Sequence, residues 1–219
     1  MASPAPLLPP PPKALRILPH KAATWFRVHP FDAATGKYAP AAFNGSGLGN
    51  ARFSPLFDPV TGKPIPTIYA AESERGAIAE IVLHDVPNPS AGYQHDLERD
   101  YRANLHLSRI RAPAARLVNM TTMGLQAAGL APAHLFEGDK DDYARTREWA
   151  QWIWQDMPEA QGLRWMSKRD NQSEVIMLFG DRVDTSDVDD DGSSHPMQVY
   201  ESLVIELLDE LGAGVFPSI

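Results

Sequence analysis

Apolar and polar positions along the chain predict six strands. The clearest is Glu174–Phe179, where one polar residue is followed by five apolar residues, as in a strand that is buried on both faces. Thr24–His29 alternates between the two classes and is ended by Pro30, which cannot donate to a sheet. The remaining predicted strands cover residues 67–71, 104–111, 115–120 and 163–167.

Helical spacing of apolar residues predicts four helices. The strongest runs from Asp139 to Met157 and is stopped by Pro158. Ser73 is a suitable N-cap for a helix that ends near His84. A short helix is predicted over residues 123–128 and a last one over 197–211, where Gly212 ends it. Strands and helices interleave without a regular alternation, so we predict one α+β domain with a mixed or antiparallel sheet flanked by helices.

The domain organisation follows from composition along the chain. Residues 1–23 are rich in Pro and Ala, which predicts an extended N-terminal arm outside the domain. The domain then covers residues 24–219, with a core of about 24–180 and an acidic loop and helix over 184–219. Residues 31–66 form a loop that is long for a compact domain, so this segment is either functional or contains strands that the pattern does not reveal.

Composition narrows the class of protein. The chain has 219 residues, of which 43% are hydrophobic, as expected for a globular domain with a real core. A net charge of −8 argues against nucleic acid as a direct partner. Without an apolar run of about 18 residues or a secretory signal, we expect no membrane span and a cytoplasmic location. Cysteine is absent, and the seven His lack metal-site spacing, so no metal is expected.

The acidic segment that begins at Asp187 partly matches a calcium-binding loop. Asp187, Asp189 and Asp191 occupy alternate positions and Gly192 follows them, as in an EF-hand. The position that should hold a bidentate Glu is Gln198, and the segment before the loop predicts a strand where the motif needs a helix. A solvated acidic turn is therefore favoured over a calcium site, which stays open.

Glu80 stands alone among apolar neighbours. The window Ala77–Leu83 contains no other polar residue, and a helix that is apolar nearly all round is normally buried. An ionised Glu is seldom fully buried unless something pairs with it. Glu80 therefore either lines a cavity beside Arg52 and Tyr69 or forms a structural ion pair with Arg52. Spacing alone does not separate these two interpretations.

Six short segments follow one another in an order that is found in a known family. In chain order they are residues 26–28, 51–55, 66–71, 77–84, 162–167 and 175–179. Arg52 and Glu80 lie within two of these segments, and Ser167 ends another. Together the segments resemble the RES domain family, which is named after Arg, Glu and Ser. The order of the segments, more than any one of them, carries the resemblance.

The resemblance implies a fold like that of the ADP-ribosyltransferases and a toxin that degrades NAD⁺ by cleaving the nicotinamide–ribose bond. On this basis Glu80 would stabilise the developing ribosyl cation or hydrogen-bond the ribose hydroxyls. Arg52 would hold the diphosphate or ribose, and Tyr69 would stack on or orient the nicotinamide. Ser167 would hydrogen-bond the substrate near the scissile bond. Further substrate-binding candidates are Arg27, Phe53 and Ser173, the last as a rival to Ser167. NAD⁺ is then a substrate, and no cofactor is implied.

The family also implies a protein partner. RES-type toxins pair with an Xre-like antitoxin whose C-terminal segment reaches the site, often in a hetero-oligomer. Water and phosphate remain alternative acceptors for the ADP-ribosyl group. Two other functions also stay open: a protein ADP-ribosyltransferase that uses the same pocket, and a non-enzymatic binding module linked to calcium through the acidic loop.

Overall fold

The computed structural model describes residues 15–87, 90, 92–136 and 143–216. The predicted arm lies outside the described residues up to residue 14, so its arrangement there stays a prediction. Its last part is different: Ile17–His20 forms a strand, β1, that pairs with residues 115–118. The start of the domain at residue 24 stays a prediction, and β1 lies before it in the chain. β1 belongs to the sheet, and Leu15, two residues before β1, is buried in the core.

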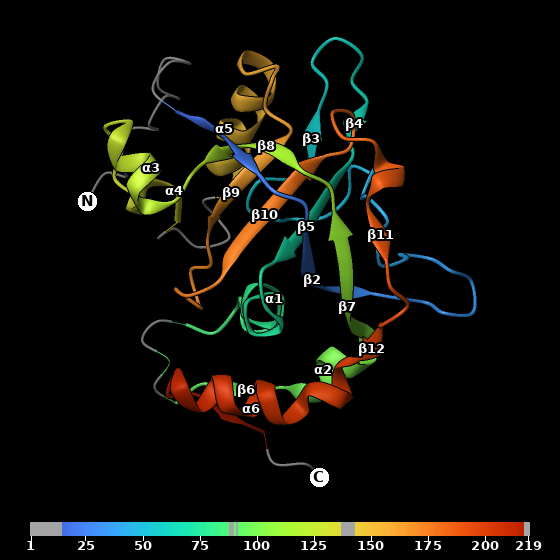
Figure 1. Cartoon of the computed structure of the whole chain (residues 1–219). Helices are drawn as coiled ribbons and strands as arrows, with labels where there is room; N and C mark the ends of the chain where they lie inside the picture. Colours follow the sequence, from blue (N-terminus) through green and yellow to red (C-terminus); the bar gives the residue numbers. More distant parts are fainter. Residues whose placement is uncertain (1–14, 88–89, 91, 137–142, 217–219) are drawn as a thin grey trace.

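One large mixed sheet forms the centre of the molecule (Figure 1). Its neighbouring strands pair antiparallel, except that β8 and β9 are parallel. In the order in which they pair, the strands are β1, β8 (Ala115–Asn119), β9 (Gly162–Met166), β10 (Glu174–Phe179), β5 (Thr67–Ala71), β2 (Ala23–Pro30), β7 (Leu105–Ala112) and β11 (Asp189–Asp190), with β12 (His195–Pro196) also on β7. This confirms the predicted α+β class with a mixed sheet.

Smaller elements surround the sheet. Two short two-stranded pairs are β3 (Leu56–Phe57) with β4 (Pro64–Ile65), and β6 (Gln94–His95) with β13 (Gly214–Val215). The α-helices are α1 (Glu74–Ile81), α2 (Leu97–Arg102), α3 (Thr122–Ala127), α4 (Ala133–Phe136), α5 (Tyr143–Asp156) and α6 (Glu201–Glu210), and η2 (Thr185–Asp187) and η3 (Met197–Tyr200) are 3-10 turns. The predicted helix over 139–157 is confirmed from Tyr143, and residues 139–142 lie outside the described part.

Both faces of the sheet are buried, as the sequence of β10 predicted. Val175, Met177 and Phe179 contribute to one apolar cluster, together with side chains from α1, α5 and α6. Ile176 and Leu178 point to the other face, into a second cluster that includes Val183 and Val188. The helices and the cavities described below lie on the first of these faces.

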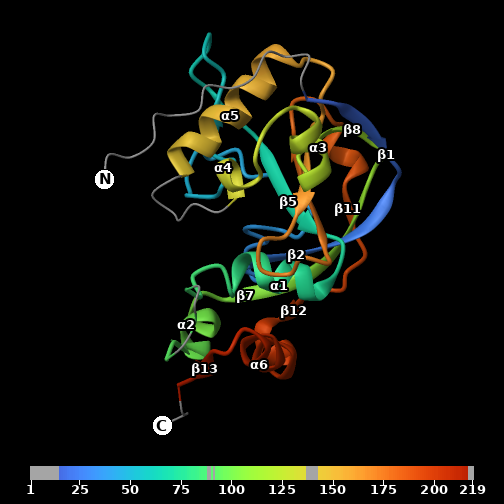
Figure 2. The same ribbon diagram turned by 90° about the vertical axis from the view of Figure 1, so that its left-hand side faces the viewer.

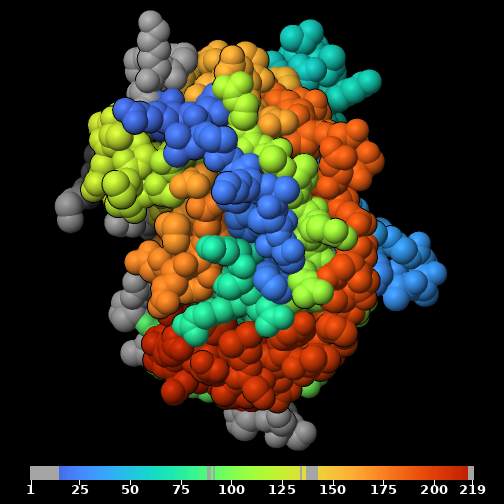
Figure 3. Space-filling model, viewed as in Figure 1, coloured from blue at the N-terminus to red at the C-terminus, as the bar shows by residue number. Residues whose placement is uncertain are grey.

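The helix α1 is placed between the sheet and α6, and α5 lies at the opposite end of the molecule from α6 (Figures 1 and 2). Ser73 accepts a hydrogen bond from the N–H of Gly76, as predicted for the N-cap of α1. The surface of α6 (red in Figure 3) covers the lower end of the molecule beneath α1. Gly212 has a φ of 71° just after α6, a left-handed conformation that ends the helix. None of the helices described is long and apolar enough to cross a membrane.

Candidate functional site

Two cavities share a wall on the helical side of the sheet. The larger has a volume of about 870 Å³ and the smaller about 370 Å³. Four side chains line both of them: Arg52, Glu80, His84 and Tyr143. The larger cavity is completed by the loop after β9 and by α4, and the smaller by β2, β5 and the segment around residues 44–54. The long loop over residues 31–66 is thus part of the site, and it also contains β3 and β4.

Glu80 reaches this shared wall from the last turn of α1. The buried residues Gly76–Ala79 fix the helix against the sheet, which leaves the Glu80 side chain half-buried at the cavities. The backbone N–H of Lys168 donates a hydrogen bond to Glu80 Oε1 at 3.2 Å. Among the described residues Glu80 takes part in no ion pair. Of the two interpretations of Glu80, the structure therefore gives the cavity and not the Arg–Glu pair.

Arg52 is held by a carbonyl group and by aromatic rings. Its Nη1 donates to the Leu135 carbonyl oxygen at 3.1 Å. The guanidinium carbon lies 4.9 Å from the centre of the Tyr143 ring and 5.7 Å from that of Phe136, within the range of cation–π contacts. No ion pair of Arg52 occurs in the part of the chain that the structure describes. Its charge therefore remains available to an anion in the cavities.

Tyr69 lines the smaller cavity, and Phe53 lies behind it. The Tyr69 hydroxyl donates to Ser54 Oγ at 3.1 Å and accepts from the Phe53 N–H at 3.3 Å. Burial raises the pKa of Tyr69 well above its usual range, so the hydroxyl is neutral. Phe53 is fully buried against Trp165 and Phe136 and lines neither cavity. The Phe53 side chain therefore supports the wall from the core, and its predicted role in substrate binding stays a prediction.

The two candidate serines take different places. Ser167 is fully buried at the wall of the larger cavity, and its Oγ accepts the N–H groups of Arg169 at 3.3 Å and Asp170 at 3.1 Å. Ser173 lines neither cavity. Its hydroxyl donates to Asp170 Oδ2 at 2.6 Å and lies 2.5 Å from Ser73 Oγ. Ser173 is thus a core contact of α1, and its predicted role in substrate binding stays a prediction.

Arg27 lines the smaller cavity from β2. Its Nη1 donates to the carbonyl oxygens of Pro40 and Ala42, each at 2.9 Å. Burial lowers the pKa of Arg27 to about 10, which still leaves it protonated at neutral pH. The neighbouring His29 is buried in the same wall, and burial, followed by the charge of Arg27, lowers its pKa to about 4. One cation therefore stands beside a neutral imidazole.

The sequence did not single out His84 or Tyr143. His84 Nε2 hydrogen-bonds the Tyr143 hydroxyl, and His84 Nδ1 lies 2.8 Å from Asp85 Oδ1. Burial raises the pKa of Tyr143, with Glu80 adding to the shift and Arg52 opposing it. His84 ends the apolar run that contains Glu80, which was the available signal. Tyr143 lies on the apolar stripe of its helix, where a core role was the natural prediction.

The cavities are more positive than the chain as a whole. Their ionisable walls carry four cationic side chains and two carboxylates, hence a formal charge of +2 with His neutral, whereas the chain carries −8. The cations are Arg27, Arg52, Lys168 and Arg169, and the carboxylates are Glu80 and Asp85. A concave cationic wall attracts anionic ligands to a protein that is otherwise acidic. The two cavities can therefore hold a ligand that has an anionic part and an aromatic part, with the Glu80 carboxylate on the wall between the two parts.

The acidic loop does not gather its carboxylates. Asp191 forms an ion pair with Arg109, and Asp189 lies 3.6 Å from Arg111, both on β7. Asp187 lies in the η2 turn that precedes β11. Within the described ranges, no three His, Asp or Glu side chains are grouped to hold a metal ion. The loop therefore lacks the convergent geometry that an EF-hand requires.

Comparison with known proteins gives one family and one fold. The family model described as "RES domain" matches residues 24–198. No curated protein matches the chain in sequence. Among solved structures, a chain in the crystal structure of the M. tuberculosis MbcT–MbcA toxin–antitoxin complex has a TM-score of 0.60 at 16% identity. The similarity covers 88% of this chain and 93% of that one, and at this identity it shows a shared fold.

Proposed function

The chain belongs to the RES domain family, and on that premise we propose that it is the toxin of a bacterial toxin–antitoxin pair that cleaves the nicotinamide–ribose bond of NAD⁺. One observation carries this proposal: Glu80 lies on the wall shared by two cavities of unequal size. NAD⁺ has its labile bond between a small aromatic base and a large anionic remainder. Two adjoining compartments with a carboxylate between them suit such a molecule.

The chemistry needs one carboxylate. When the bond between ribose C1′ and the nicotinamide nitrogen breaks, both electrons go to the nitrogen and positive charge develops on the ribose. A carboxylate fixed beside the ribose stabilises that charge. Nicotinamide leaves as a neutral molecule, so no general acid has to protonate it, and an acceptor then adds to C1′. Glu80, whose carboxylate accepts the Lys168 N–H, is assigned this role.

The walls suggest how the substrate lies. We place the ADP half in the larger cavity, where Arg52, Lys168 and Arg169 supply positive charge for the diphosphate. The nicotinamide enters the smaller cavity, whose wall includes Phe26 and Tyr69. Ring stacking and a neutral Tyr69 hydroxyl suit an aromatic carboxamide.

The partner follows from the same premise. We propose an Xre-like antitoxin that inserts its C-terminal segment near the site and forms a hetero-oligomer with this chain in the cytoplasm. The fold shared with a chain of the MbcT–MbcA toxin–antitoxin complex supports an antitoxin as the partner. A segment bound over the larger cavity would compete with NAD⁺ for Arg52 and Glu80.

The proposal is tested by incubating the purified chain with NAD⁺, with and without phosphate, and measuring free nicotinamide by chromatography. We expect release, and the adduct formed identifies water or phosphate as the acceptor. Glu80→Gln keeps an acceptor for the Lys168 N–H but removes the charge, so release should fall at least about 100-fold. Glu74→Gln, on the same helix but outside both cavities, is the matched control and should retain activity.

Two outcomes contradict the proposal. A folded wild-type protein that releases no nicotinamide overturns the assigned reaction. Label from NAD⁺ that appears on a protein target, with little free ADP-ribose, would instead identify a protein ADP-ribosyltransferase that uses the same pocket.

A further inference from the structure

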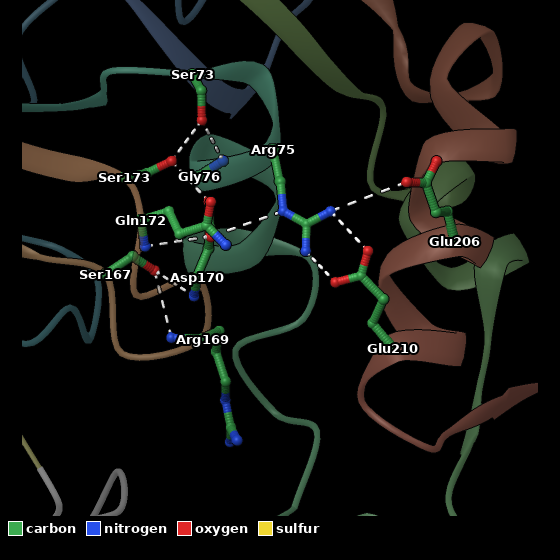
Figure 4. A network of polar contacts seen from close by, with 10 residues as sticks. All are labelled: Ser73, Arg75, Gly76, Ser167, Arg169, Asp170, Gln172, Ser173, Glu206 and Glu210. Atoms are coloured by element: carbon green, nitrogen blue, oxygen red, sulfur yellow. Dashed lines mark hydrogen bonds and ion pairs between the residues drawn. The ribbon is translucent and has the colours of Figure 1, made fainter.

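The loop between β9 and β10, residues 167–173, is fastened along one face of α1. Ser73, Gly76 and Glu80 are spaced by three and four residues and therefore share a helix face. Ser73 Oγ lies 2.5 Å from Ser173 Oγ at one end of the loop, and Glu80 accepts the Lys168 N–H at the other. Figure 4 shows the Ser73 end of this contact, where the Ser73 hydroxyl lies between Ser173 Oγ and the N–H of Gly76. Glu80 is thus tied to a loop that α1 itself positions.

Gly76 allows the close approach. A Cβ added at this position would lie 2.4 Å from Ser173 Cβ and 2.7 Å from Ser173 Oγ. No side chain larger than hydrogen fits at this distance without movement of the loop. The separation of α1 and the loop is therefore set by Gly76.

Asp170 is the charged centre of the loop. Its side chain is buried, with 4% of the residue exposed. Oδ2 accepts the Ser173 hydroxyl at 2.6 Å, and Oδ1 lies 3.6 Å from Nε of Arg75 on α1. The Asp170 N–H donates to Ser167 Oγ at 3.1 Å. A buried carboxylate without these partners would be costly, so the loop conformation and the position of α1 depend on each other through Asp170.

Arg75 extends the network to the last helix. Its guanidinium donates to both carboxylate oxygens of Glu210 on α6, and Glu206 lies 4.0 Å away (Figure 4). This helix, Glu201–Glu210, follows the residues that match the family, which end at 198. Arg75 is therefore fixed from two sides, by the loop and by a helix outside the matched region.

Neither Asp170 nor Arg75 lines the cavities, whereas Ser167 and Lys168 do. We propose that Asp170 is a positioning residue for Glu80: it fixes the 167–173 loop on α1 so that the Lys168 N–H holds the Glu80 carboxylate in one orientation. This role rests on the function proposed above. A carboxylate that is oriented before the reaction pays no reorganisation cost as charge develops on the ribose. Loss of Asp170 should therefore slow the chemical step and leave substrate binding intact.

The test compares Asp170→Asn with wild type in steady-state nicotinamide release from NAD⁺. The substitution keeps the size of the side chain and removes its charge. We expect kcat to fall by about 10- to 100-fold, as for a small misplacement of a catalytic group, with KM within about twofold of wild type. The Kd for ADP-ribose, measured by calorimetry, should not change, and thermal unfolding should show a folded protein.

Two further variants keep the proposal falsifiable. If Asp170→Asn does not fold, Arg75→Gln decides, because Arg75 is partly exposed and its loss removes the cationic partner of Asp170; kcat should again fall at constant KM. Arg116→Gln breaks an exposed pair with Glu159 and is the matched control, with both constants unchanged.

A folded Asp170→Asn with wild-type kcat overturns the positioning role, as does a raised KM at constant kcat. If Asp170→Asn is unfolded, a wild-type kcat in Arg75→Gln overturns the positioning role. The role is also overturned if the control Arg116→Gln loses as much kcat as Arg75→Gln. A wild type that releases no nicotinamide overturns the proposed function together with this role. If the wild type releases nicotinamide and Asp170→Asn does so at the same rate, only the positioning role of Asp170 is overturned.

Discussion

The Arg52 guanidinium carbon lies 4.9 Å from the centre of the Tyr143 ring, on the wall that the two cavities share. Arg52 comes from the long loop after β2 and Tyr143 from the first residue of α5. The Arg52 guanidinium is held by the Tyr143 ring and by the Leu135 carbonyl oxygen. Both groups orient the guanidinium, and neither neutralises its charge. The charge is therefore directed at whatever anion enters the cavities.

Arg52→Lys should weaken substrate binding although it keeps the charge. A lysine has no planar fork to lie on the Tyr143 ring and to hold two phosphate oxygens. Loss of one charge-assisted hydrogen bond costs at least about 1.5 kcal/mol, which raises KM for NAD⁺ about tenfold. Nicotinamide release over a range of NAD⁺ concentrations measures this. Arg116→Lys, on an exposed strand position, is the control, and an unchanged KM in Arg52→Lys would exclude a bidentate role.

Substitutions of Tyr143 separate its ring from its hydroxyl. Tyr143→Phe keeps the ring beside Arg52 and loses the hydrogen bond to His84, so KM should stay within about twofold, and kcat should fall by no more than about tenfold. Tyr143→Leu loses the ring as well, and removal of the cation–π contact, worth about 1 kcal/mol, should raise KM about fivefold. Equal KM values for the two variants would mean that the ring does not orient Arg52.

Gly76→Ala should destabilise the protein, against the usual trend in helices. Alanine normally stabilises a helix interior by about 0.5–1 kcal/mol relative to glycine. Here the new Cβ would meet Ser173 Cβ at 2.4 Å, and such overpacking costs about 1–3 kcal/mol. Urea unfolding gives the sign directly. In the double variant with Ser173→Gly the clash is absent, so part of the lost stability should return; a stabilised single variant would contradict the close approach.

His29 should make the fold sensitive to mild acid. Burial lowers its pKa to about 4, whereas a histidine in the unfolded chain titrates near about 6.5. Between these values the unfolded chain binds a proton that the folded chain does not bind, so the free energy of unfolding falls as pH drops from about 6.5 to about 4. At most about 3 kcal/mol is lost in this way.

Urea unfolding at pH 7, 6 and 5 measures this slope. The variant His29→Asn should show a flatter dependence, because its side chain does not titrate. His195→Asn replaces an exposed histidine of β12 and serves as the control; its slope should match that of wild type. Equal slopes for His29→Asn and wild type would show that His29 does not titrate differently in the folded protein.

Local patterns predicted most elements because each depends on neighbouring residues. Alternation predicted β2, a continuous apolar run predicted β10, and Ser73 predicted the start of α1. The pattern missed β1, because Ile17–His20 lies within a Pro-rich segment and is a strand by virtue of its pairing with β8. The pattern also did not predict β6, which is a strand because it pairs with the distant β13. The spacing of apolar and polar residues within a short segment does not reveal which distant strand that segment pairs with.

The candidate site, like the fold, could be predicted from the sequence only in part. The sequence by itself determined that Glu80 is a carboxylate on an apolar helix. The order of several short segments, which resembles the RES domain family, predicted that Arg52, Tyr69 and Ser167 belong to the same site as Glu80. The tertiary structure decided that Arg52 does not neutralise Glu80, that Phe53 and Ser173 face the core, and that His84 and Tyr143 share the wall. The physical reason is that a side chain's chemistry is local, whereas its environment is set by segments far away in the chain, which only the packed fold brings together.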